Sequence, residues 1–220
     1  MKRKKILALF IVGVLTSGVI PMNYVRAENI NAVAGAEGYQ IVLDFENGQM
    51  GKWIGIESDD MEIVGEGDNH VLKINASGEN QYVLNQDTLP FRDGTIRFRF
   101  KSLTEPAVDA KFGFTFRHEG SNQDAPTFMQ TPVKGKWNLY QPGHDSSQES
   151  GVSLNVNEYN DIEITIRENH YILKINGEVA NDSQKDGFNT APGYCGFKFT
   201  DGNLNAREFY IDDFEVEGVE

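Results

Sequence analysis

Two adjacent carboxylates near the end of the sequence, Asp212 and Asp213, lie where the apolar pattern changes parity. The apolar residues of 209–211 alternate before the pair, and those of 214–216 alternate after it on the other parity. A β-bulge produces such a slip within one strand. We therefore predict a bulge at this pair and ask what its carboxylates bind.

Two further acids, Asp44 and Glu46, lie in the stretch LDFENG, which the alternation predicts to be the first strand. First and last strands often lie side by side in closed sandwiches. Ca²⁺ takes about six to eight oxygen ligands, and an inward carboxylate needs a cation or hydrogen-bond donors. The sequence predicts one structural calcium ion held by Asp44, Glu46, Asp212 and Asp213. The alternative is that these acids blunt exposed strand ends.

The segment from Arg117 to Asp145 contains the residue types that bind sugars. Sugar rings pack their C–H groups on aromatic faces, and polar side chains bind their hydroxyls. In the stretch KWNLY, Trp137 and Leu139 share one face of a strand. Asn138 and Tyr140 share the other face, so one of these two pairs must belong to the core. The expected ligand-binding residues are Arg117, Phe128, Gln130, Trp137, Asn138, Tyr140 and His144.

Paired acids for glycoside hydrolysis are the competing interpretation, since glycosidases place two carboxylates at the scissile bond. Asp161 and Glu163 share one face of the stretch EYNDIEITIRE, and Asp145 is a third candidate. Arg97 and Arg99 lie at outward parity on another predicted strand. Cross-strand ion pairs on a solvated face explain the same pattern without catalysis. The sequence has no zinc-protease motif, phosphate loop or nucleophile elbow.

The first 27 residues resemble a secretory signal peptide, with a basic head, an apolar run from Ile6 to Val19 and the site Val25-Arg26-Ala27. We expect cleavage after Ala27, a lead-in over 28–38 and a secreted protein. Cleavage leaves 15 basic and 33 acidic residues, a formal net charge of −18. Such a surface repels nucleic acid and anionic lipid, so we expect neither nucleic-acid nor membrane partners.

Alternating apolar residues dominate from Tyr39 onward, with no helical period, and predict strands that each bury one face. Asn176-Gly177, between two alternating runs, predicts a tight hairpin. About ten to thirteen short strands fit one all-β domain over 39–220, a two-sheet antiparallel β-sandwich.

Other single residues are expected to be structural. Cys195 alternates with phenylalanines and cannot form an internal disulfide, so it is predicted to be a small buried residue. Trp53 is expected to fill the core. The histidines show no metal-ligand spacing and are expected at the surface: His70, His118, His144 and His170.

The stretches LDFENGQMGKW and FYIDDFEVEG resemble the paired terminal strands of concanavalin A-like or laminin G-like jelly-roll domains of secreted bacterial carbohydrate-associated proteins. DGTIRFRFK, YNDIEITIRENHYILKINGE and GYCGFKF carry the same resemblance. It implies a calcium between the end strands, at Glu46 and Asp212 or Asp213. The glycosidase signature Glu-x-Asp-x-x-Glu is absent.

We therefore expect a monomeric, secreted, non-catalytic, lectin-like module whose partner is a glycan or polysaccharide. The alternatives are a glycoside hydrolase on the same fold and a protein-binding adhesive module. The sequence shows no sorting motif or hydrophobic tail that would tether the protein at its end.

Overall fold

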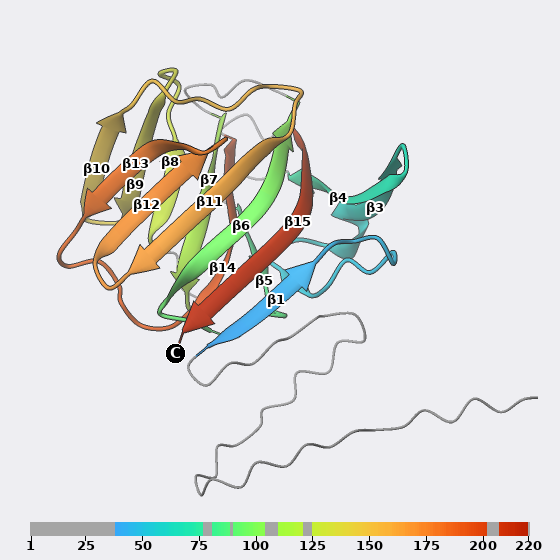
Figure 1. Cartoon of the computed structure of the whole chain (residues 1–220), viewed down its shortest axis with the longest axis horizontal. Coiled ribbons are helices and arrows are strands. Elements are labelled where there is room, and N and C mark those ends of the chain that lie inside the picture. Colours follow the sequence, from blue (N-terminus) through green and yellow to red (C-terminus); the bar gives the residue numbers. More distant parts are fainter. Residues whose placement is uncertain are drawn as a thin grey trace, which may run out of the picture.

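The computed structural model describes residues 38–76, 81–88, 90–103, 110–120, 125–201 and 207–219. They form two antiparallel sheets packed face to face (Figure 1), which confirms the predicted sandwich. The predicted signal peptide lies outside the described residues, as does the lead-in up to residue 37. Within those ranges, no helix is long and apolar enough to cross a bilayer.

The larger sheet has eight strands in the order β13-β12-β11-β6-β15-β4-β3, with β1 paired to β15. These strands are β1 (Tyr39–Leu43), β3 (Met61–Glu66), β4 (Asn69–Ala76), β6 (Asp93–Ser102), β11 (Asn160–Arg167), β12 (His170–Ile175), β13 (Glu178–Gln184) and β15 (Arg207–Val219). A short 3₁₀ helix, η1 (Ser58–Asp60), precedes β3.

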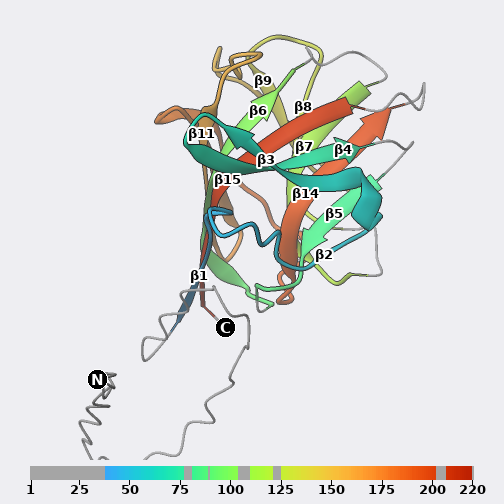
Figure 2. The ribbon, with the colours of Figure 1, turned by 90° about the vertical axis from the view of Figure 1, so that its right-hand side faces the viewer.

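The smaller sheet has seven strands in the order β10-β9-β8-β7-β14-β5-β2. They are β2 (Trp53–Ile54), β5 (Gln81–Asn85), β7 (Ala110–His118), β8 (Thr127–Gln130), β9 (Lys136–Gln141), β10 (His144–Glu149) and β14 (Tyr194–Asp201). Figure 2 shows β14 and β5 of this sheet on one side and β15 and β11 of the larger sheet on the other.

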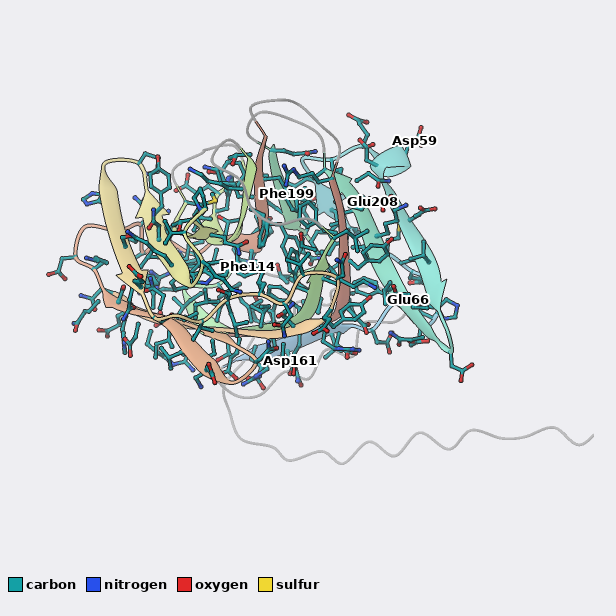
Figure 3. All side chains as sticks on the ribbon, turned by 90° about the horizontal axis from the view of Figure 1, so that it is seen from above. Asp59, Glu66, Phe114, Asp161, Phe199 and Glu208 are labelled. Carbon is teal, nitrogen blue, oxygen red and sulfur yellow. The ribbon has the colours of Figure 1, made fainter. Side chains whose placement is uncertain are left out.

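Phenylalanine rings fill the space between the sheets. Phe98 of β6 contacts Phe114 of β7 and Phe197 of β14, with ring centroids 5.1 and 5.4 Å apart. Figure 3 shows Phe114 and Phe199 inside the sandwich and Asp161 on its outside. Because alternate residues of a strand face opposite sides, the repeated phenylalanines form one continuous aromatic core.

The predicted bulge in β15 is confirmed. The pairing of β15 with β6 shifts between Asp212 and Glu215, and Asp213 has a φ of 48°. Two β15 residues therefore stand opposite a single β6 residue. Phe209 and Phe214 are both buried although their parities differ, so the bulge keeps both halves of the strand facing the core.

The first and last strands are neighbours, as expected. β1 pairs antiparallel with β15 from Tyr39↔Gly218 to Leu43↔Phe214, and both views show them side by side (Figures 1 and 2). The Asn176-Gly177 hairpin is also confirmed, since φ is 52° and 81° at these residues, as a tight turn between β12 and β13 requires.

Cys195 and Trp53 are structural, as predicted. Cys195 is fully buried, and burial raises the pKa of its thiol to about 12. Trp53 is 8% exposed, stacks near Phe197 and donates its indole N–H to the carbonyl of Met50 over 2.7 Å. Both therefore contribute to packing.

Candidate ligand-binding face

The outer face of the seven-stranded sheet holds the best candidate site. On β9, Trp137 and Leu139 are completely buried between the sheets. Asn138 and Tyr140 point to the outer face and are partly exposed. The sequence left open which pair is buried. The structure shows that Trp137 and Leu139 belong to the core and that Asn138 and Tyr140 face outward.

Lys198 of β14 lies between two tyrosine rings on this face. It stands directly opposite Tyr82 of β5. Its Nζ is 4.7 Å from the centroid of the Tyr82 ring and 5.4 Å from that of Tyr140. These are cation–π distances. Lys198 is only 6% exposed, and burial lowers the pKa of its amine.

His118, at the end of β7, completes the cluster and corrects the expectation of a surface histidine. It is 3% exposed, and its ring centroid is 4.6 Å from that of Tyr82. Nδ1 accepts a hydrogen bond from the backbone N–H of Gly120 over 2.9 Å. Burial first, and then the nearby charge of Lys198, lowers the pKa of His118 to about 4.

At neutral pH the imidazole is therefore uncharged. Because Nδ1 is an acceptor, this tautomer carries its proton on Nε2. Nε2 is buried and has no hydrogen-bond partner among the residues that the structure describes. His118 thus presents an unused N–H donor beside the Tyr82 ring.

Two small residues, Thr127 and Gly113, lie between Tyr140 and Lys198 on this face, and Met129 lies between Gly113 and Asn138. β7 and β14 place Gly113 and Lys198 opposite each other, and β8 contributes Thr127 opposite Tyr140. The hydroxyl of Thr127 donates to that of Thr115 over 3.1 Å. With small side chains between them, the Lys198 amine and the Tyr140 ring approach each other across two intervening strands.

Two predicted ligand residues lie in the core instead. Phe128 and Trp137 have no exposed surface. Trp137 stacks on Phe114 with ring centroids 5.8 Å apart and donates its indole N–H to the carbonyl of Val152 over 3.2 Å. Neither ring offers a face to a sugar in this structure, because both have the inward parity of their strands.

Arg117 is also buried, contrary to its outward parity in the sequence. Its φ of 52° interrupts the alternation of β7 and turns the side chain inward. The guanidinium donates five hydrogen bonds and forms an ion pair with Asp93 at 3.0 Å. The acceptors are the carbonyls of Arg92, Glu168 and Asn189, the Tyr171 hydroxyl and the Asp93 carboxylate. Arg117 therefore joins the two sheets.

The last two predicted ligand residues point away from Tyr140. Gln130 pairs with Trp137 and shares its inward parity, and its buried Oε1 has no hydrogen-bond partner. His144 pairs with Gln141 and lies 5.6 Å from the ring of Phe188 at the sheet edge. Of the seven predicted ligand residues, the structure places only Asn138 and Tyr140 on this face.

Sequence reasoning missed Tyr82, His118 and Lys198. Lys198 alternates with two core phenylalanines in FKF, so its outward parity is readable from the sequence. Its neighbours are not, because Tyr82 and Tyr140 come together only through the strand order of the sheet.

The four acids predicted to hold calcium are not assembled as a ligand set. Asp212 is 1% exposed, and its Oδ2 accepts from Arg99 over 2.9 Å and from Asn69 over 2.8 Å. Both Glu46 oxygens contact His70. Within the ranges that the structure describes, no group of three or more His, Cys, Asp or Glu residues is arranged to hold a metal ion.

The other acids nevertheless affect the pKa of Asp213. Burial, followed by the negative charge of Asp212, raises the pKa of the Asp213 carboxyl, and Asp44 and Glu46 contribute in the same direction. The bulge therefore gathers negative charge near the β1–β15 pair, and Arg99 neutralises one of its acids, Asp212.

The candidate catalytic acids lie on the outer face of the other sheet. Asp161 stands opposite Arg99, and Glu163 opposite Arg97. They line a cavity of about 450 Å³ that also contains Lys174. Hydrogen bonds from Lys174 and Arg97 lower the pKa of Glu163, so it remains ionised. The side chain of the third candidate, Asp145, lies outside the described residues.

Solved structures resemble this fold, although no protein-family model and no curated protein sequence matches the chain. Domain 4 of AbnA, a GH43 extracellular arabinanase from Geobacillus stearothermophilus, in complex with arabinotriose, is 9% identical with a TM-score of 0.59. The alignment covers 84% of this chain and 94% of that one.

Two further structures have the same architecture. The β-glucanase of Bacillus licheniformis is 10% identical, covers 82% of this chain and 98% of its own, and has a TM-score of 0.57. Carbohydrate-binding module CBM66 from Bacillus subtilis is 11% identical, covers 76% of this chain and 96% of its own, and has a TM-score of 0.54. The chain therefore has the jelly-roll, concanavalin A-like fold of carbohydrate-associated proteins.

Proposed function

We propose that this protein is a secreted, monomeric, non-catalytic module that binds a glycan on the outer face of its seven-stranded sheet. The observation that carries the proposal is the pair Asn138 and Tyr140, partly exposed on one strand face beside Lys198. The fold supports it, because structures with this fold include a carbohydrate-binding module and an arabinanase domain in complex with arabinotriose.

The chemistry of the pair suits a sugar. Tyr140 supplies an aromatic surface on which axial C–H groups pack. Asn138 accepts a hydrogen bond from the Ser147 hydroxyl over 2.7 Å at its Oδ1, which leaves its amide N–H groups to donate to sugar hydroxyls, since they donate to none of the described residues. The two residues lie two positions apart on β9, about 7 Å along the strand. A sugar ring on Tyr140 thus keeps its hydroxyls within reach of Asn138.

A glycan array followed by titration calorimetry tests the proposal. We expect Tyr140→Ala to weaken the best array ligand about tenfold, which corresponds to about 1.4 kcal/mol. Tyr210→Ala is the matched control, because Tyr210 is an outward-facing tyrosine on the other sheet with the Lys101 amine 4.5 Å from its ring centroid. An empty array, or equal losses in the two variants, would overturn the proposal.

Hydrolysis at Asp161 and Glu163 is the alternative function. Ion pairs with Lys174 and Arg97 favour the ionised form of Glu163, which suits a nucleophile or general base but not the general acid, so Asp161 would have to be the acid. Product release from an oligosaccharide panel discriminates between the two functions. If the protein cleaves an oligosaccharide and Glu163→Gln abolishes that cleavage, the function is catalysis on the eight-stranded sheet and not binding on the seven-stranded one.

A further inference from the structure

The outer face of the seven-stranded sheet contains two buried hydrogen-bond donors without acceptors. Lys198 forms no ion pair or hydrogen bond in the part of the chain that the structure describes, although only 6% of it is exposed. Nε2 of His118 is buried without a partner. Both groups contact the same ring, Tyr82. Two unused donors therefore lie around one aromatic side chain.

A second lysine in the molecule shows what such an amine ordinarily requires. Lys101, on the outer face of the eight-stranded sheet, also lies over two tyrosine rings, at 4.6 Å from Tyr159 and 4.5 Å from Tyr210. Its amine is paired with the carboxylate of Glu66. Lys198 likewise lies over two tyrosine rings, but no carboxylate of the described residues pairs with it.

An unpaired buried charge is costly, because the interior does not replace the solvation that water provides. The lowered pKa of Lys198 reflects that cost. The cation–π contacts of Lys198 with the two tyrosine rings offset only part of this desolvation cost. An external acceptor that carries negative charge would compensate both donors at once.

We infer that the glycan bound at this face carries a carboxylate, as a uronic acid does, and that Lys198 and His118 bind this carboxylate. The inference rests on the proposed glycan-binding function and names the ligand class. One carboxylate oxygen accepts from the Lys198 ammonium and the other from the His118 Nε2–H. Tyr140 and Asn138 then contact the sugar ring on the neighbouring strands.

Other ligand classes match these donors less well. A neutral sugar hydroxyl accepts from His118 but leaves the lysine charge without a counter-charge. A sulfate ester also carries negative charge, so the titration below compares it directly with the carboxylate. The acidic chain repels polyanions at long range, but that repulsion is screened beyond about 8 Å at physiological salt, so contacts at the face decide affinity.

Titration with a matched series of trisaccharides tests the inference: galacturonate, its methyl ester, neutral galactose and sulfated galactose. We expect wild type to bind the galacturonate form at least tenfold more tightly than the methyl ester and the neutral form. Lys198→Met should bind the acid, ester and neutral forms with equal affinity. Lys101→Met is the matched control and should leave the preference unchanged.

The outcomes separate the two proposals. Equal affinity for acid, ester and neutral forms would overturn the carboxylate inference and leave glycan binding standing. Tighter binding of the sulfated form would also overturn it. Failure to bind any glycan, in this series and on the array, would overturn both proposals.

A melting experiment checks the premise without any ligand. Because Lys198→Met removes an unpaired buried amine and nearly conserves volume, we expect the melting temperature of the free protein to rise. Lys101→Met breaks an ion pair and should lower it. A lower melting temperature for Lys198→Met would show that the amine has a partner in the free protein, and the inference would fall.

Discussion

Replacing Arg117 by lysine provides the sharpest test of how the two sheets are held together. The guanidinium has no exposed surface and donates five hydrogen bonds, including those to the Asp93 carboxylate and the Tyr171 hydroxyl. A lysine ammonium has three N–H donors, so at least two acceptors lose their partner. Each buried unsatisfied group costs about 1–3 kcal/mol. We therefore expect the free energy of unfolding to fall by about 2–6 kcal/mol.

For a domain of this size, about 1 kcal/mol corresponds to a shift of about 2–4 °C in melting temperature. Arg117→Lys should therefore melt roughly 5–20 °C below wild type, with a matching shift in the urea midpoint. Arg92→Lys is the control, since Arg92 is exposed and such surface changes usually stay within about 0.5 kcal/mol. An Arg117→Lys protein as stable as this control would refute the account of the five bonds. Weaker glycan binding at unchanged stability would restore Arg117 as a ligand residue.

The remaining predictions concern pH, calcium and thiol reactivity. Because burial and Lys198 lower the pKa of His118 to about 4, from about 6.5 in the unfolded chain, its contribution to stability is fully present above pH 6.5 and lost as pH falls towards 4. The loss approaches about 3 kcal/mol; urea titrations at several pH values should therefore show a shallower acid loss in His118→Gln, and equal slopes would contradict the assignment. The calcium prediction requires a melting temperature that is higher in calcium than in EDTA or magnesium, with the difference lost in Asp213→Asn; identical melts would contradict a structural calcium ion at this edge. Cys195, buried with a pKa of about 12, should react with a thiol reagent only after unfolding, and rapid labelling of the native protein would disprove its burial.

The sequence alone determined the class of fold and several local features. Period-two alternation of phenylalanine and isoleucine predicted the sandwich, because a strand between a core and solvent must alternate. The parity change at Asp212 predicted the bulge, and Asn176-Gly177 predicted the hairpin, since both depend on backbone geometry within a few residues. Parity also placed Arg97 and Glu163 on outward faces, and they form an ion pair because β6 lies beside β11.

The composition of the site depended on tertiary structure. Sequence parity placed Arg117 outside, but one residue in the left-handed region turned it into the core. Parity also shows that Trp137 and Tyr140 face opposite sides of β9, yet only the packing of the second sheet shows which side is inside. Lys198 meets Tyr82 and Tyr140 because β14 lies beside β5 and is separated from β9 by two strands, β7 and β8. Strand order arises from contacts between distant segments, so alternation within one strand predicts which residues share a face but not which neighbours they meet.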